Sequence, residues 1–132
     1  MDMPTAVRTV LGRYATFSGR ASRSEYWWWT LTVLLLMLVV GLVEGALLPP
    51  MMGMEPYQAD AGQPISMVVS LALLLPCLAV SVRRLHDRDK SGWWYLLGLV
   101  PVVGPVVLLV WYVQAGTHGD NRFGPDPLDR AE

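Results

Sequence analysis

Three long hydrophobic runs, separated by polar segments, dominate this chain. They cover residues 26–48, 65–82 and 93–113. Each run is long enough to cross a hydrocarbon core of about 30 Å as a helix. None has the polar face that a helix in a soluble bundle needs. The pattern therefore predicts an all-α fold, a small polytopic membrane protein with three transmembrane helices.

A shorter amphipathic segment precedes the first run. Its apolar residues recur at helical spacing after Pro4: Val7, Val10, Leu11, Tyr14 and Phe17. This spacing predicts a short helix lying in the inner headgroup region of the bilayer. Ser22 and Glu25 then form a capping-box pattern, which predicts that the first membrane helix begins there.

The third run allows two interpretations. Aromatic residues stand at both of its ends, as membrane anchors do, and favour a full crossing. Helix-breaking residues lie at its midpoint: Gly98, Pro101, Gly104 and Pro105. They would suit a re-entrant hairpin that returns to the cytoplasmic side, provided that the broken backbone is buried against protein. We expect the crossing and keep the re-entrant hairpin as the alternative.

The chain accordingly divides into three parts. Residues 1–25 form a basic, amphipathic cytoplasmic segment, and residues 26–113 form the transmembrane domain. Residues 114–132 contain Gly, Pro and Asp throughout and lack apolar periodicity. They are expected to form an irregular polar tail.

Composition and charge support the membrane assignment and set its orientation. The chain is 53% hydrophobic and only 16% charged, which is unlike a soluble domain. Its net charge of −1 conceals an asymmetry. Eight of the ten basic residues lie before the first run or between the second and third: Arg8, Arg13, Arg20, Arg23, Arg83, Arg84, Arg88 and Lys90. The loop at 49–64 has no basic residue, so the positive-inside rule places the N-terminus in the cytoplasm and this loop outside.

Motifs for catalysis are lacking in the sequence. It contains no Gly-rich phosphate loop, nucleophile elbow, Cys/His ligand set or HExxH pattern. We therefore expect no enzymatic activity, no catalytic residue, no metal site and no cofactor. Cys77 lies inside the second run without a disulfide partner in the chain and is interpreted as a small membrane-buried residue.

Polar residues at the predicted cytoplasmic helix ends form the candidate site: Arg20, Arg23, Arg83, Arg84, His86, Asp87 and Arg88. One interpretation is that these residues only set topology. The other is that their guanidinium groups bind an anionic lipid headgroup or another phosphate-bearing ligand. His86 beside Asp87 would also suit a pH sensor, although a single loop histidine is more often a plain polar residue.

A small oligomeric channel or transporter is the alternative function. Gly41 and Gly45 have the spacing of a helix-packing motif, and Pro76 would kink the second helix. Glu44 is the one ionisable residue inside a hydrophobic run, although its position suits a side chain that reaches the outer headgroup region. Three helices do not easily enclose a pore, so this function requires a homo-oligomer.

Three polar strings carry a family resemblance. They are Phe17 to Trp27, then Ser81 to Asp87 followed by Lys90 to Trp94, and finally Gly116-Thr117 with Asn121 to Pro127. With them the chain resembles the bacterial inner-membrane family catalogued as domain of unknown function 805. The resemblance implies a bacterial cytoplasmic (inner) membrane location and supplies no biochemical activity. The chain departs from the pattern at Arg88-Asp89, where many members have a small residue and Gly.

The expected function is therefore a non-enzymatic one. The basic cytoplasmic face would bind a partner protein, in the membrane or the cytoplasm, or membrane lipids with anionic headgroups. Nucleic acid is not expected as a partner, because the basic segments are short and tethered to the bilayer. The three polar strings would form one site only if they met on one side of the membrane, which requires the re-entrant hairpin.

Overall fold

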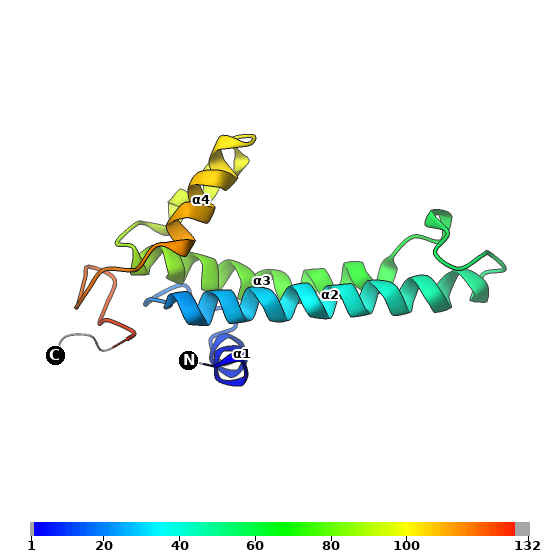
Figure 1. Ribbon diagram of the computed structural model, residues 1–132, viewed down its shortest axis with the longest axis horizontal. Helices are drawn as coiled ribbons and strands as arrows, with labels where there is room; N and C mark the ends of the chain where they lie inside the picture. Colours follow the sequence, from blue (N-terminus) through cyan, green and yellow to red (C-terminus); the bar gives the residue numbers. More distant parts are fainter. Residues whose placement is uncertain (1, 129–132) are drawn as a thin grey trace. The chain divides into compact units, whose positions relative to one another are not determined.

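The computed structural model describes residues 2–128; Met1 and residues 129–132, the end of the expected tail, lie outside the described residues. Its elements follow in the order α1 (Met3–Gly12), α2 (Arg23–Met51), η1 (Ala59–Ala61), α3 (Pro64–Asp87), η2 (Gly92–Leu99) and α4 (Val103–Val113) (Figure 1). Across residues 2–128 no β-strand occurs, and one isolated bridge joins Asn121 and Gly124. The all-α class is thus confirmed.

The chain forms two compact units. The first unit contains residues 1–30 and 75–132, and the second contains residues 31–74. Within the first unit, the start of α2 lies beside the end of α3, where the Trp29 indole N–H donates to the Cys77 thiol sulfur over 3.4 Å. Cys77 is a free thiol.

Helix α1 corresponds to the predicted amphipathic segment but is shorter. The Asp2 carboxylate caps it by accepting a hydrogen bond from the Thr5 N–H at 3.0 Å. Hydrogen bonding by Thr5, first from its side chain and then from its N–H, lowers the pKa of Asp2. Because α1 ends at Gly12, Tyr14 and Phe17 lie beyond the helix. Both side chains are nevertheless exposed, as is that of Leu11.

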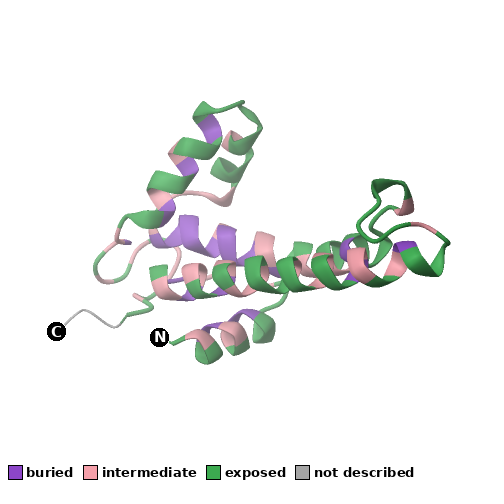
Figure 2. Ribbon diagram, turned by 45° about the vertical axis from the view of Figure 1, so that its right-hand side comes forward, coloured by how far each residue is buried: buried purple, intermediate pink, exposed green. Residues whose placement is uncertain are grey.

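Helices α2 and α3 are the two elements long and apolar enough to cross a membrane. Their 29 and 24 residues correspond to about 43 and 36 Å of helix. Only 6% and 28% of their most apolar stretches are buried inside the protein. Figure 2 shows exposed residues along most of α2. A core helix of a soluble protein would be mostly buried, so this exposure fits helices whose apolar surfaces are turned toward lipid.

The beginning of α2 agrees in part with the predicted capping box. The Ser22 hydroxyl accepts a hydrogen bond from the Glu25 N–H at 3.2 Å, as a capping residue does. The Glu25 carboxylate instead forms an ion pair with Arg83 at 2.5 Å. Ser22 is therefore the cap, and Glu25 links α2 to α3.

In the second unit, Glu44 caps the start of α3. Its carboxylate accepts hydrogen bonds from the Ile65 N–H at 2.5 Å and from the N–H and hydroxyl of Ser66 at 2.9 and 2.7 Å. Glu44 is only 3% exposed. The side chain predicted to reach the outer headgroup region is thus engaged by the first N–H groups of a helix, which favour a negative charge.

The three residues predicted to pack or kink the helices, Gly41, Gly45 and Pro76, differ from one another in their surroundings. The ring of Tyr57, from the loop between the helices, lies against Gly45, and the Tyr57 N–H donates to the Gly45 carbonyl at 2.7 Å. A side chain added at Gly41 would meet open space. Pro76 is buried within α3, which continues through it as one helix.

The third hydrophobic run does not form the single helix expected over residues 93–113. It folds into a hairpin of the 3-10 helix η2 and the α-helix α4. Ser91 caps η2 by accepting a hydrogen bond from the Trp93 N–H at 3.3 Å. Trp94 near the start of the run and Trp111 near its end lie in edge-to-face contact, with ring centroids 5.6 Å apart. The two ends of the run are therefore adjacent.

The midpoint residues explain the reversal. Val102, with a φ of 67°, is the centre of a tight γ-turn in which the Val103 N–H donates to the Pro101 carbonyl at 2.7 Å. Pro105 falls in the first turn of α4, where its missing N–H costs no helical hydrogen bond. Gly104 lies so close to the Leu97 carbonyl that any side chain there would overlap it. The predicted count of three crossings is therefore not confirmed.

Candidate functional site

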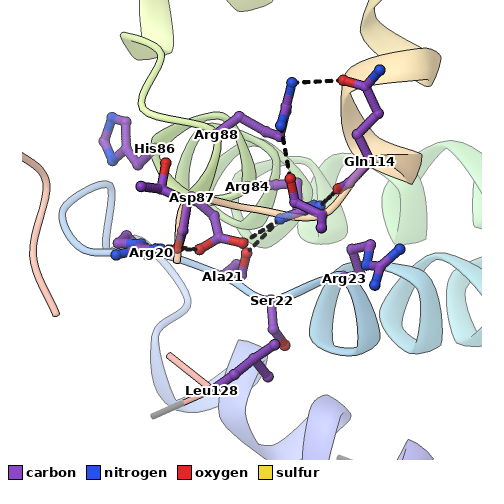
Figure 3. A network of polar contacts seen from close by, with 12 residues as sticks. Arg20, Ala21, Ser22, Arg23, Arg84, His86, Asp87, Arg88, Gln114 and Leu128 are labelled. Atoms are coloured by element: carbon purple, nitrogen blue, oxygen red, sulfur yellow. Dashed lines mark hydrogen bonds and ion pairs between the residues drawn. The ribbon is translucent and has the colours of Figure 1, made fainter. Parts of the chain in front are cut away.

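The carboxylate of Asp87, at the last residue of α3, is the centre of a buried polar network (Figure 3). One oxygen accepts from Arg20 Nε at 2.9 Å, and the other accepts from Arg84 Nη1 at 2.5 Å. All three side chains are 1% exposed or less. Opposite charges this close and this buried attract strongly, because little water screens them. The cost of removing water from the charges offsets much of this attraction, so the larger effect is the penalty of leaving one partner buried and unpaired.

Arg20 attaches the tail to this centre. Its Nη1 atom donates to the carbonyls of Gly119 and Gly124 at 2.6 and 3.3 Å, and its Nη2 atom donates to the Thr117 carbonyl at 2.5 Å. Together with Asp87, these partners occupy every nitrogen of the guanidinium group. Arg20 is therefore a structural crosslink between the segment before α2 and the tail.

Arg84 connects the same centre to α4. It donates to the carbonyls of Tyr112 at 3.2 Å and Ala21 at 3.3 Å, and also to the Gln114 carbonyl. One turn later, Arg88 donates to the Ala115 carbonyl at 2.7 Å. The end of α4 and the two residues after it are thus held by Arg84 of α3 and by Arg88, which directly follows α3.

The tail lies directly on the end of α3. The Thr117 N–H donates to the Asp87 carbonyl at 2.7 Å, and Gly116 is so close to the Asp87 carboxylate that a side chain would overlap it. His86 is stacked on Phe123 with ring centroids 4.0 Å apart. Its Nδ1 atom is 2.9 Å from the Gly19 carbonyl, and since a carbonyl only accepts, Nδ1 carries the proton.

Arg83 forms the second buried ion pair, with Glu25. The side chain of Arg83 is fully buried, and its Nε and Nη2 atoms have no hydrogen-bond partner within residues 2–128. Arg23, by contrast, is exposed and donates to the Val113 carbonyl at 3.2 Å.

The structure thus brings the predicted site residues together at the ends of α2 and α3, but with an arrangement that the sequence did not indicate. Arg20, Arg83, Arg84, His86 and Asp87 are buried, Arg88 is half-buried and Arg23 is exposed. Sequence reasoning missed their main partners, which are the backbone carbonyls of the tail and the carboxylate of Glu25. Backbone carbonyl groups cannot be recognised from the side chains of a sequence. The polar string at 116–127 was the one available signal that the tail takes part in this site.

Exposed basic residues lie elsewhere, on and after α1. A cavity of about 470 Å³ adjoins them and is lined by Thr9, Arg13, Arg20, Ser22, Glu25, Pro127 and Leu128. Arg8 and Arg13 are exposed. For metal binding, residues 2–128 contain no group of three or more His, Cys, Asp and Glu side chains placed to hold an ion.

Two long lipid-facing helices, joined to a short hairpin and a tail by a buried arginine–aspartate network, define a small helical membrane protein. The chain belongs to the family described as protein of unknown function (DUF805), whose model matches residues 14–125. This confirms the resemblance, and the matched range includes all of the network.

Relatives agree with the membrane location. The chain is 43% identical over 119 residues to the inner membrane protein YhaH of Escherichia coli (strain K12), which covers 89% of this chain and 92% of that protein. It is also 43% identical over 120 residues to the inner membrane protein YhaI of the same strain, covering 90% and 92%. The uncharacterized protein YiiR of that strain is 28% identical over 144 residues, covering 86% and 87%. No solved structure matches the chain.

Proposed function

We propose that the protein crosses the inner membrane twice, through α2 and α3, and that η2 and α4 form a re-entrant hairpin on the cytoplasmic side. With 8 residues in η2 and 11 in α4, each leg is only about 16 Å long. A hydrocarbon core of about 30 Å is too thick for either leg to cross. The contact between Trp94 and Trp111 closes the open end of the hairpin.

The charges support this orientation. The segment before α2 and the loop at 88–91 carry the basic residues, which favours the cytoplasm for both. Arg20 bonds to the tail and to Asp87, so the tail lies on the same side of the membrane. The N-terminus, the hairpin ends and the tail then all face the cytoplasm.

On this cytoplasmic surface, the protein binds the headgroups of anionic phospholipids and catalyses no reaction. The observation that carries this proposal is the cavity beside α1, which exposed Arg13 lines together with Pro127 and the exposed side chain of Leu128. Three further exposed apolar side chains lie close to Arg13 in the sequence. Leu11, Tyr14 and Phe17 are suited to insert into the acyl boundary, and Arg13 is suited to bind a phosphate with two parallel hydrogen bonds. The negative charge of Glu25 in the cavity wall is paired with Arg83 and does not oppose an anion.

The buried arginines serve a different purpose in this proposal. The guanidinium nitrogens of Arg20 and the charge of Arg84 are already satisfied by Asp87 and by carbonyl groups. They hold the surface in shape, while the residues outside the network contact the lipid.

Replacement of Arg13 by Ala tests the function. Protein in nanodiscs containing phosphatidylglycerol and phosphatidylcholine is released into detergent, and the retained lipid is identified by native mass spectrometry. The preference for phosphatidylglycerol should fall about fivefold, the effect of about 1 kcal/mol per basic residue near an anionic surface. Arg122→Ala is the matched control, because Arg122 is an exposed arginine of the tail paired with Asp89. Unchanged preference in Arg13→Ala, or an equal loss in Arg122→Ala, would contradict the proposal.

A further inference from the structure

A second cavity of the first unit lies between the hairpin and the start of α2. Its volume is about 430 Å³, within the range of small-molecule sites. Its lining combines hydroxyl-bearing and apolar residues, among them Tyr26, Ser81, Tyr95, Leu99, Leu109 and Tyr112. No charged residue lines it.

The hydroxyl group of Tyr112 is the unusual feature of this cavity. Tyr112 is only 6% exposed, and within residues 2–128 its buried hydroxyl has no hydrogen-bond partner. Its ring cannot easily turn to find one, because it packs on the Tyr26 ring at a centroid distance of 4.5 Å. Its carbonyl is held by the indole N–H of Trp27 at 3.1 Å and by Arg84. A nearby side-chain hydroxyl is that of Ser81, which lines the same cavity but makes no hydrogen bond of good geometry with Tyr112. The cavity therefore presents a buried hydroxyl donor that lacks a well-placed acceptor, an arrangement that buried polar groups rarely keep.

The residues that line the cavity determine which kind of ligand can supply an acceptor for the Tyr112 hydroxyl. A phosphate or carboxylate would need a cation, and the lining provides none. A neutral carbonyl attached to an apolar chain matches both the hydroxyl and the apolar wall. Leu96, Leu99 and Leu109 of the wall are also exposed, so the cavity is accessible from the surface that the hairpin presents to lipid.

We propose that this cavity binds an acyl chain of a membrane phospholipid, with the Tyr112 hydroxyl donating a hydrogen bond to the ester carbonyl. The expected depth of Tyr112 in the membrane fits this ligand. Tyr112 lies near the end of α4 and contacts Arg84, so it is at the level of the polar network. Ester carbonyls lie at the same boundary between the headgroups and the hydrocarbon core. The inference rests on the proposed placement of the hairpin in the membrane and is independent of Arg13 and of headgroup charge.

Ester and ether lipids with the same headgroup test this site directly. The full-length protein is reconstituted with equal amounts of diester and diether phosphatidylcholine, and the lipid retained in mild detergent is measured by native mass spectrometry. The wild-type protein should retain the ester lipid about fivefold better, as expected for one net hydrogen bond. Tyr112→Phe keeps the ring, lacks the hydroxyl and should retain both lipids equally.

Three controls separate the possible outcomes. Tyr57→Phe removes a hydroxyl from the second unit, where it donates to the Leu42 carbonyl, and should retain lipid like the wild type. Leu109→Trp fills the cavity and should reduce retention of both lipids. Arg13→Ala should leave the ester preference intact, which distinguishes this site from the headgroup site. Equal retention of both lipids by the wild type, an ester preference that survives in Tyr112→Phe, or displacement of the ester lipid by an added ubiquinone analogue would overturn the proposal.

Discussion

At the scale of single residues, the one negative charge of Asp87 faces two positive charges. Two buried guanidinium groups, those of Arg20 and Arg84, share this one carboxylate. The remaining positive charge is stabilised by carbonyl dipoles, mainly from residues 112–124. The tail is therefore part of the electrostatic balance of the fold, since without its carbonyl groups the two arginines would be buried with too few acceptors.

Asp87→Asn tests this balance. The substitution keeps the shape of the side chain and removes the negative charge, so we expect the free energy of unfolding to fall by about 3–5 kcal/mol, as for other broken buried pairs. Unfolding in mild detergent, followed by circular dichroism, measures the change. Hydrogen exchange at residues 115–124 should rise at the same time.

Asp89→Asn is the matched control for this substitution. Asp89 pairs with Arg122, and the two side chains are 47% and 61% exposed. Because exposed pairs contribute little, the stability of this variant should stay within about 0.5 kcal/mol of the wild type. Similar losses in both variants would show that Asp87 has no special role.

At the scale of elements, the hairpin depends on close backbone approach at its tip. The γ-turn at Val102 is strained, because a β-branched residue rarely adopts a positive φ. Gly104 then allows the first turn of α4 to lie against the Leu97 carbonyl. The contacts between the two legs have to stabilise the hairpin by more than this strain costs.

Gly104→Ala should destabilise the hairpin, although alanine favours helices. The intrinsic propensity gain in α4 is about 1 kcal/mol, but the added methyl group would overlap a backbone carbonyl that cannot move aside easily. We expect a net loss of about 1–3 kcal/mol in the free energy of unfolding. In the matched control Gly98→Ala, the new methyl group would lie 3.4 Å from the Leu108 side chain, an ordinary contact, and stability should change little. A Gly104→Ala variant as stable as the wild type would rule out the tight hairpin tip.

At the scale of the whole molecule, the two crossings that we propose would place the segment before α2 and the described tail on one side of the membrane. The proposed number of crossings depends on two features. The apolar surfaces of α2 and α3 are mostly exposed, and each leg of the hairpin is too short to cross a bilayer. The polar strings that carry the family resemblance then lie on a single surface. Within the first unit, the contacts of Arg20 with residues 117, 119 and 124 bring the first and last of these strings together, as a shared site requires.

Cysteine labelling in intact cells tests this topology. In a Cys77→Ser background, His118→Cys places an exposed thiol in the tail, and Asp60→Cys places one in the loop between α2 and α3. A membrane-impermeant maleimide should label Asp60→Cys from outside and should label His118→Cys only after permeabilisation. Labelling of His118→Cys in intact cells would establish a third crossing.

Several features of the protein could be predicted from the sequence, because their signals are local. The two long helices follow from long apolar runs, and Ser22 caps α2 where its position indicated. The prediction for the third run was wrong in detail, since its aromatic ends favoured one helix and its central prolines and glycines favoured a break. The structure contains the break, since residues 100–102 separate η2 from α4.

By itself, the sequence determined the helical class, the two lipid-facing helices, the family and which residues would gather at the helix ends. Only the tertiary structure decided that the third run folds back on itself and that the arginines are buried against the tail. The physical reason is that both features depend on contacts between distant backbone groups. The Leu97 carbonyl accommodates Gly104, and the carbonyls of residues 117–124 satisfy Arg20, but backbone carbonyls are identical at every position of a sequence.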